Sequence, residues 1–141
     1  MLFRSGKSDN ISFIGRVPFA DVLKITQRSD AVFCMLDPGD INSKIGTPNK
    51  LFEAMACGRL IICTKGTYSG DFVEREGTGL AVDYSEAALR EAIVSLRDDR
   101  ELREKLGRNA LRAAVSRYNW PNEERKLLEI YAGLQARPQG H

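Results

Sequence analysis

Lys50 and Glu53 are two charged residues three positions apart in the segment 46–64, where most of their neighbours are apolar. On a helix, this spacing places both side chains on one face. One interpretation is a surface ion pair, which contributes only about 0.2–0.5 kcal/mol. The other is an anion site, since a lysine in the first helical turn costs about 0.3–1 kcal/mol unless an anion binds there. These residues alone slightly favour the ion pair.

The segment that carries both residues predicts a turn, a short helix, a glycine stop and a buried strand. Pro48 suits the first helical turn, where its missing N–H would have no partner. Gly58 stands where helices commonly end in a left-handed residue. The run 60–63 is apolar throughout, which is typical of a strand covered by helices on both faces. The apolar residues that recur at helical spacing, and so form one stripe, are Leu51, Phe52, Met55 and Ala56.

Short apolar runs alternate with helical patterns along the whole chain, which predicts a parallel sheet with right-handed crossovers. The predicted strands are residues 11–14, 31–36, 60–63 and 80–82. The predicted helices outside the segment 46–64 are residues 19–28, 71–76, 86–97, 98–115 and 121–134, with loops at 37–47 and 65–70. Ser85 is the expected cap of one helix, and Asp98 with Glu101 resembles a capping box for the next.

The predicted fold class is therefore α/β, with a Rossmann-like parallel sheet of about four strands, flanking helices and a helical C-terminal extension. A length of 141 residues suffices for one core. We expect residues 1–10 to be a connector, residues 11–134 the domain and residues 135–141 a tail. Because four strands make a small sheet, we expect part of a doubly wound domain rather than a complete one.

Composition excludes several classes of function. The net charge of +2 is too small to indicate nucleic-acid binding. No apolar run approaches the roughly 20 residues that span a bilayer, and the start lacks a secretory signal, so we expect a cytoplasmic protein. The 3 cysteines form no close pair, so we expect reduced thiols and no metal site. The only histidine is His141, so a histidine base would have to come from another chain.

Other polar residues have ordinary explanations. Asp37 and Asp40 flank a Pro-Gly pair and are typical of a turn rather than a metal site. The arginines of residues 97–117 are interleaved with acidic residues, as on a solvated helical face. Trp120 could stack a nucleobase, but we expect a buried packing residue where the last helix docks.

Any ligand should lie beyond the carboxyl ends of the strands, as in other open α/β sheets. Three of the loops that follow the strands carry glycine and hydroxyl residues, which let backbone N–H groups approach phosphate oxygens. The chain contains neither a Walker sequence nor the dinucleotide fingerprint. A phosphate or nucleotide ligand is the resulting hypothesis.

The ordered motifs of the chain resemble the C-terminal domain of family 4 (group 1) retaining glycosyltransferases, which have the two-domain glycosyltransferase B fold. The resemblance runs from residue 11 to residue 134, and its most specific part is TPNKLFEAMACG at 47–58. The other matching motifs, in family order, are ISFIGRV at 11–17, SDAV at 29–32, GDFV at 70–73, GTGL at 77–80 and YNW at 118–120.

This resemblance implies a donor site for a nucleotide-diphosphate sugar and reverses the ranking of the two interpretations of Lys50 and Glu53. It implies that Glu53 holds the ribose hydroxyls, which suits a carboxylate that accepts two hydrogen bonds. The loop with Arg16 and Val17 should lie near the base. The diphosphate should lie at the helix start, on Thr47, Asn49 and Lys50. Neither a metal nor a cofactor is expected.

Three positions depart from the family pattern. Many members have a second glutamate, eight residues before the ribose-binding one, that contacts the donor sugar, and here that position is Ile45. Leu60 stands where proline is usual, and Asp71 where glutamate is usual. The change at Ile45 weakens the expectation of sugar contacts but not the family resemblance.

The family's N-terminal domain, with its acceptor site, has no counterpart here, nor do the Arg and Lys that neutralise the leaving diphosphate. The catalytic residues are therefore unassigned, and we expect no useful sugar transfer by this chain alone. Its partner could be a separate N-terminal polypeptide, or the chain could self-associate through an open sheet edge. Two alternatives are a non-catalytic nucleotide-sugar-binding module or pseudoenzyme remnant, and, with less support, a nucleotide-sugar epimerase. The complete enzyme could associate peripherally with a membrane.

Overall fold

A three-stranded parallel sheet forms the centre of the computed structural model, which describes residues 11–135. Its strands are β1 (Ala31–Cys34), β2 (Leu60–Thr64) and β3 (Gly79–Val82), in the spatial order β1-β2-β3. In the parallel register, Ala31 pairs with Leu60, and Ile61 with Gly79. Every residue of β2 is at most 2% exposed, as the apolar run predicted.

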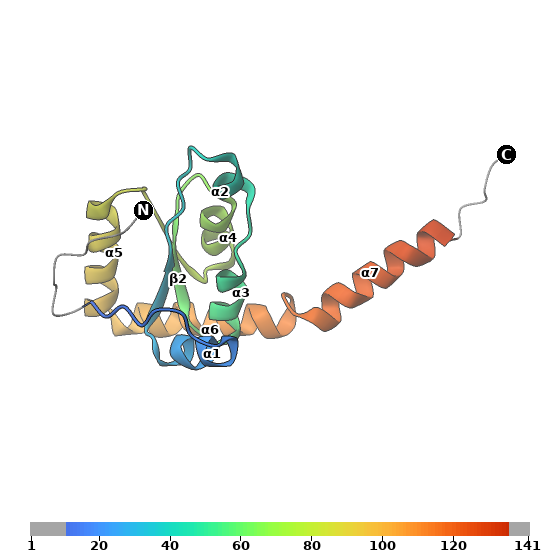
Figure 1. Cartoon of the computed structure of the whole chain (residues 1–141), viewed down its shortest axis with the longest axis horizontal. Helices are drawn as coiled ribbons and strands as arrows, with labels where there is room; N and C mark the ends of the chain where they lie inside the picture. Colours follow the sequence, from blue (N-terminus) through green and yellow to red (C-terminus); the bar gives the residue numbers. More distant parts are fainter. Residues whose placement is uncertain (1–10, 136–141) are drawn as a thin grey trace.

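Helices cover both faces of this sheet (Figure 1). Helix α5 lies on one side, whereas α2, α3 and α4 lie on the other, and α6 passes across the end of the sheet beside α1. The α/β fold class predicted from the sequence is confirmed. The helices are α1 (Phe19–Arg28), α2 (Ile41–Ile45), α3 (Asn49–Ala56), α4 (Tyr68–Glu76), α5 (Glu86–Asp98), α6 (Arg100–Ser116) and α7 (Trp120–Gln135).

The side chains of β2 alternate between two hydrophobic clusters, one on each face of the sheet. Ile61 and Cys63 belong to the cluster formed with α3, α4 and α6. Leu60 and Ile62 belong to the cluster formed with α5 and α6. The apolar run 60–63 is thus explained by burial on both faces.

The strand predicted at residues 11–14 is wrong. This segment pairs with no strand, and Ile11, Phe13 and Ile14 are 57%, 72% and 61% exposed. A β-strand requires a neighbour that satisfies its backbone N–H and C=O groups, and among residues 11–135 none pairs with this segment. The sheet consequently has three strands instead of about four. The predicted connector (1–10) and all but the first residue of the predicted tail (135–141) lie outside the described residues.

Local hydrogen bonds explain two loops that turn out to be helical. The predicted loop 37–47 contains α2, because the Asp40 carboxylate accepts a hydrogen bond of 2.8 Å from the Ser43 amide and caps the helix. Helix α4 begins at Tyr68 instead of residue 71, because the Thr67 hydroxyl accepts from the Gly70 amide at 3.1 Å. Side-chain caps of this kind decide where a short helix begins.

The two predicted caps farther along the chain have different outcomes. Ser85 caps α5 by accepting from the Ala88 amide, as expected. Helix α6 is capped by Asp99, which accepts from the Leu102 amide at 2.8 Å, so the predicted role of Asp98 is wrong. The Asp98 carboxylate instead pairs with Arg97, at 2.7 Å from its Nε.

The side chain of Glu76, at the end of α4, makes polar contacts with the junction between α6 and α7. It is 6% exposed, accepts a hydrogen bond of 2.8 Å from the Tyr118 hydroxyl and pairs with Arg75 and Arg117. Burial opposes the ionisation of Glu76, but hydrogen bonds from Tyr118 and Arg75 and the charge of Arg117 outweigh it and lower its pKa. The carboxylate is therefore charged, and it stabilises the junction.

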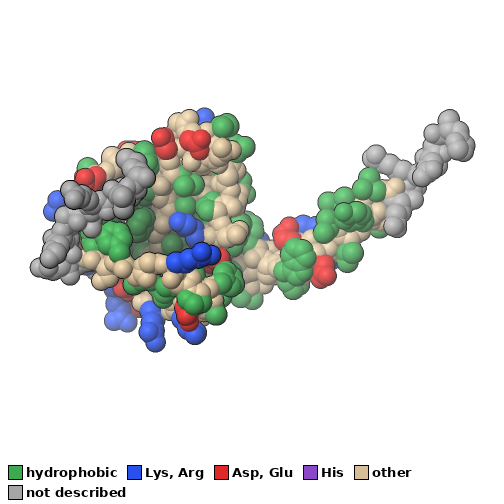
Figure 2. Space-filling model, in the orientation of Figure 1, with side chains coloured by type: hydrophobic (Ala, Val, Ile, Leu, Met, Phe, Trp, Pro, Cys, Tyr) green, Lys and Arg blue, Asp and Glu red, His purple; other side chains and the backbone are tan. Residues whose placement is uncertain are grey.

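Helix α7 projects away from the sheet and the other helices (Figure 1), with hydrophobic side chains on the face seen in Figure 2. Trp120, at its start, is 68% exposed, so the prediction of a buried packing residue is wrong. Within residues 11–135 no element covers this indole, because α7 leaves the body of the protein at that point. The other large hydrophobic residues exposed on α7 are Leu127, Leu128, Ile130, Tyr131 and Leu134.

We predict that Glu76→Gln lowers the free energy of unfolding by about 1–3 kcal/mol, because the variant loses a charged acceptor for the hydrogen bonds from Arg75, Arg117 and Tyr118. The pKa of Glu76 is lowered in the folded state, so its stabilisation is present above the unfolded pKa of about 4.3 and is lost as the pH falls through the folded value. Urea unfolding at neutral and acidic pH measures both effects. The exposed Glu74 on α4 supplies the control, and an equal loss in Glu74→Gln would contradict the assignment.

A second prediction contrasts two helical glycines. A Cβ at Gly107 of α6 would lie 2.6 Å from the carbonyl oxygen of Gly58, whereas nothing lies within 4 Å of a Cβ at Gly133 of α7. Gly107→Ala should therefore destabilise the protein by about 1–3 kcal/mol. Gly133→Ala should be neutral or slightly stabilising, because alanine favours helix by about 1 kcal/mol. Thermal unfolding compares the two, and stabilisation by both would show that α6 need not approach Gly58 closely.

Candidate functional site

The start of α3 opens at the carboxyl ends of β1 and β2. This helix begins at Asn49, and the residue before it, Pro48, makes no side-chain hydrogen bond to the first turn, whereas side chains cap α2, α4, α5 and α6. Thr47, Asn49 and Lys50 lie together in this turn, and all three are exposed. An uncapped helix start offers free N–H groups and a positive dipole end. The structure therefore brings the three residues predicted to bind diphosphate together at one accessible turn.

The Lys50 ammonium is close enough to the ends of β1 and β2 to influence the cysteine thiols there. Burial raises the pKa of the Cys63 thiol to about 12, nearby Cys34 raises it too, and the Lys50 ammonium lowers it. Burial likewise raises the pKa of Cys34, and Lys50 again acts in the opposite direction. Because Cys34 and Cys63 are partners in the β1–β2 register, Lys50 lies beside the carboxyl ends of these neighbouring strands.

Glu53 lies one turn farther along α3 and is half-buried. Within residues 11–135, no nitrogen–oxygen distance of 4.0 Å or less joins Lys50 to Glu53. The interpretation of these two residues as a surface ion pair is therefore wrong. Glu53 borders a cavity of about 470 Å³ between α1, α3 and the end of α6. Its carboxylate is available to a ligand at the surface.

An aromatic wall beside Thr47 was not predicted from the sequence. It consists of Phe52, Tyr68, Phe72 and Tyr118, and with Trp120 it lines a cavity of about 530 Å³. The ring centroids of Phe72 and Tyr118 are 4.9 Å apart, and those of Phe52 and Phe72 are 5.8 Å apart. These aromatic residues come from separate parts of the chain, so no spacing in the sequence could reveal the cluster.

Arg16 and Val17 precede α1 and are not brought into direct contact with the other predicted site residues. Arg16 is exposed and Val17 is half-buried. Over the described range, no side-chain hydrogen bond or ion pair connects either residue to Glu53 or to the start of α3. Their link to the site is indirect, since α1 packs against α3. Their predicted place near a nucleobase stays a prediction.

The polar side chains near the site serve local structure. Asp37 accepts a hydrogen bond of 2.8 Å from the Gly39 amide, and Asp40 caps α2, so both carboxylates hold backbone groups. Residues 11–135 contain no group of three His, Cys, Asp or Glu side chains placed to hold a metal ion. The expectation that binding needs no metal stays a prediction.

We predict that iodoacetamide modifies Cys57 of the native protein well before Cys34 and Cys63. Cys57 is half-buried, whereas the other two thiols are buried. The thiolate is the reactive species, and the pKa of Cys63 near 12 keeps this thiol protonated far above neutral pH. Peptide mapping after timed alkylation gives the order. Similar rates for all three thiols in denaturant are the control, and early modification of native Cys63 would contradict the burial of β2.

Comparison with known proteins agrees with this architecture. Residues 2–99 match the family model described as glycosyl transferases group 1. The chain is 24% identical over 128 residues to an uncharacterized glycosyltransferase of Methanocaldococcus jannaschii, a match that covers 90% of this chain and 31% of that protein.

A solved structure shares the fold as well. It is the sucrose-phosphate synthase of Thermosynechococcus elongatus, which superposes with a TM-score of 0.72 at 27% identity. The match covers 91% of this chain and 31% of the synthase chain. The chain thus spans about a third of the length of both relatives. Because the family model covers well over half of its residues, the chain belongs to the group 1 glycosyltransferases.

Proposed function

We propose that this chain is the donor-binding part of a retaining glycosyltransferase, which moves a sugar from a nucleotide-diphosphate sugar to an acceptor. The observation that carries the proposal is the uncapped start of α3, which presents Lys50 at the carboxyl ends of β1 and β2. In an open α/β sheet this edge is where ligands bind. Membership of the group 1 family supports the same reaction class.

The diphosphate of the donor would be held by the first turn of α3. The backbone N–H groups of Asn49 and Lys50, the Lys50 ammonium and the Thr47 hydroxyl can all donate to phosphate oxygens there. The same groups would stabilise the charge that develops on the diphosphate as the sugar leaves. The helix dipole and the lysine would thereby take the role that a divalent ion has in other transferases.

The nucleoside would extend from this turn along α3. Glu53 lies one turn beyond Lys50, and its carboxylate can accept hydrogen bonds from both ribose hydroxyls. Within residues 11–135 the Glu53 carboxylate has no ion pair. Hydrogen bonds from the two ribose hydroxyls would satisfy this carboxylate and the hydroxyls together. The base would then lie toward α1 and the segment with Arg16 and Val17.

One position favours a second candidate, a nucleotide-sugar-binding module that does not catalyse transfer. Ile45 ends α2 and is 66% exposed, at the place where many family members have a glutamate that contacts the donor sugar. An isoleucine cannot accept a hydrogen bond from a sugar hydroxyl. Donor hydrolysis or transfer by the complete protein separates the two candidates, because a binding module would show neither.

We propose that the acceptor-side groups come from a further domain or a second polypeptide. The chain spans 31% of the sucrose-phosphate synthase it resembles, and its only histidine is His141. Such a partner, or a second copy of the chain, could cover two exposed hydrophobic surfaces. One is formed by the hydrophobic residues of α7, and the other by Phe33 on the edge strand β1, whose side chain is 60% exposed.

No helix in the described part of the chain is long and apolar enough to cross a membrane. We expect no sugar transfer by residues 1–141 alone.

The test is the affinity of the chain for nucleoside diphosphates. Glu53→Ala should weaken binding by about 1–3 kcal/mol, the usual contribution of hydrogen bonds to a charged group. Isothermal titration calorimetry with uridine, guanosine and adenosine diphosphates also identifies the base. Glu129→Ala, which removes an exposed carboxylate from α7, is the matched control. Equal affinities of Glu53→Ala and the unmodified chain would reject the ribose assignment.

A further inference from the structure

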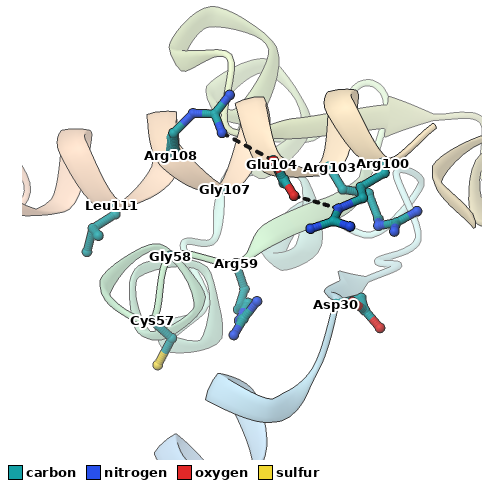
Figure 3. Close-up of a pocket in the computed structure, with 10 residues that line it drawn as sticks. All are labelled: Asp30, Cys57, Gly58, Arg59, Arg100, Arg103, Glu104, Gly107, Arg108 and Leu111. Atoms are coloured by element: carbon teal, nitrogen blue, oxygen red, sulfur yellow. Dashed lines mark hydrogen bonds and ion pairs between the residues drawn. The ribbon is translucent and has the colours of Figure 1, made fainter.

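A third cavity lies at the opposite end of the sheet from the start of α3. It has a volume of about 360 Å³, is open to solvent, and is bordered by the residues that precede β1 and β2 and by one side of α6 (Figure 3). Its lining includes four arginines but only two acidic residues. The charged lining residues, all drawn in Figure 3, are Asp30, Arg59, Arg100, Arg103, Glu104 and Arg108.

Glu104 neutralises only part of this positive charge. Its carboxylate lies 2.7 Å from the Nε of Arg100 and 3.6 Å from a guanidinium nitrogen of Arg108. Asp30 has no ion pair within 4.0 Å among residues 11–135. The cavity therefore has an excess of guanidinium groups over carboxylates.

The other two arginines are held by backbone carbonyls instead of acids. Arg59 donates to the carbonyl of Gln27, at the end of α1. Arg103 donates to the carbonyl of Leu96 and, at 2.8 Å, to that of Arg97, near the end of α5. The Nε of Arg59 is buried and has no hydrogen-bond partner in the described structure. Both side chains are thus fixed while their full charge stays available.

Two glycines make this arrangement rigid. Gly58 has a φ of +65°, a conformation that favours glycine, and it turns the chain from α3 into β2 just before Arg59. Gly107 lets the backbone of α6 approach the carbonyl of Gly58, because a Cβ there would lie only 2.6 Å from that oxygen. The arginines of α6 are consequently held at a fixed distance from Arg59.

We infer that this cavity binds a phosphomonoester, the dianion of a compound such as a sugar phosphate. Arginine is the side chain that matches a phosphate group best, through parallel N–H donors. No aromatic side chain lines the cavity, so a nucleobase would have nothing to stack on, which favours a ligand without an aromatic ring. Figure 2 shows Lys and Arg side chains along the lower edge of the molecule, where α1 and α6 lie, and their field would attract such a ligand.

This site is separate from the proposed donor site. Its residues precede β1 and β2, whereas the start of α3 lies at the carboxyl ends of the same strands. The inference therefore does not depend on the proposed function. Substitutions in one site should leave binding at the other unchanged, which keeps the two tests distinguishable.

The experiment is isothermal titration of the full chain with glucose 6-phosphate and with inorganic phosphate. Arg59→Gln should weaken both affinities about tenfold, because it removes one charged donor. Glu104→Gln should tighten both several-fold, because it frees Arg100 and Arg108 from their shared acid. A misfolded variant cannot bind more tightly, so the second substitution guards against loss of structure. Arg90→Gln, which removes an exposed arginine of α5 outside the cavity, should change neither affinity.

A lipid headgroup could present the same phosphomonoester. Flotation with phosphatidylcholine vesicles that contain phosphatidic acid tests this source, and binding that Arg59→Gln weakens would assign the cavity to the headgroup. Failure of the unmodified chain to bind glucose 6-phosphate, phosphate and these vesicles would overturn the inference. Binding that Arg59→Gln and Glu104→Gln both leave unchanged would also overturn it. A Lys50→Ala variant that binds glucose 6-phosphate as the unmodified chain does would support two separate sites.

Discussion

Burial of β2 on both faces is the constraint on which the rest of the structure depends. A strand with no residue more than 2% exposed needs a helical layer on each side, and α3, α4, α5 and α6 supply these layers. Thr64, at the end of β2, has the polar contacts that this burial requires: its hydroxyl accepts from the Leu36 amide at 3.0 Å, and its carbonyl accepts from the Thr67 hydroxyl at 2.7 Å. Thr64 therefore fixes the end of β1 and the start of α4 at once.

The two ends of this buried strand have different chemistry. At its carboxyl end, α3 begins without a side-chain cap and presents Lys50. The free N–H groups and the dipole of this helix start would stabilise an anion bound there. At its amino end, the turn at Gly58 leads into Arg59, and α6 passes close by with three further arginines. A single rigid element thus separates a proposed donor site from a proposed phosphate site.

The sequence predicted the parts of the fold that rest on local chemistry. The helix 19–28, the turn at Gly58, the buried strand after it and the cap at Ser85 were all foreseen, because periodicity, backbone conformation and capping act within a few residues. What depends on distant partners was not foreseen: the segment 11–14 lacks a neighbouring strand, and Trp120 lacks a covering element. The start of α3 was predicted as a diphosphate site only through the family resemblance, because Lys50 and Glu53 alone slightly favour an ion pair. The aromatic wall and the arginine cavity arise only when separate elements meet.

The central claim is that the first turn of α3 binds the diphosphate of a nucleotide sugar. Amide chemical shifts of the ¹⁵N-labelled chain, followed during titration with a nucleoside diphosphate, test it at single residues. The largest changes should fall on the amides of Asn49 and Lys50, whose N–H groups have no hydrogen-bond partner in the described structure, whereas the Leu51 N–H already donates to the Pro48 carbonyl at 3.0 Å. Changes confined to the region of Arg59 and α6, or no changes in the first turn of α3 at saturating ligand, would contradict the claim.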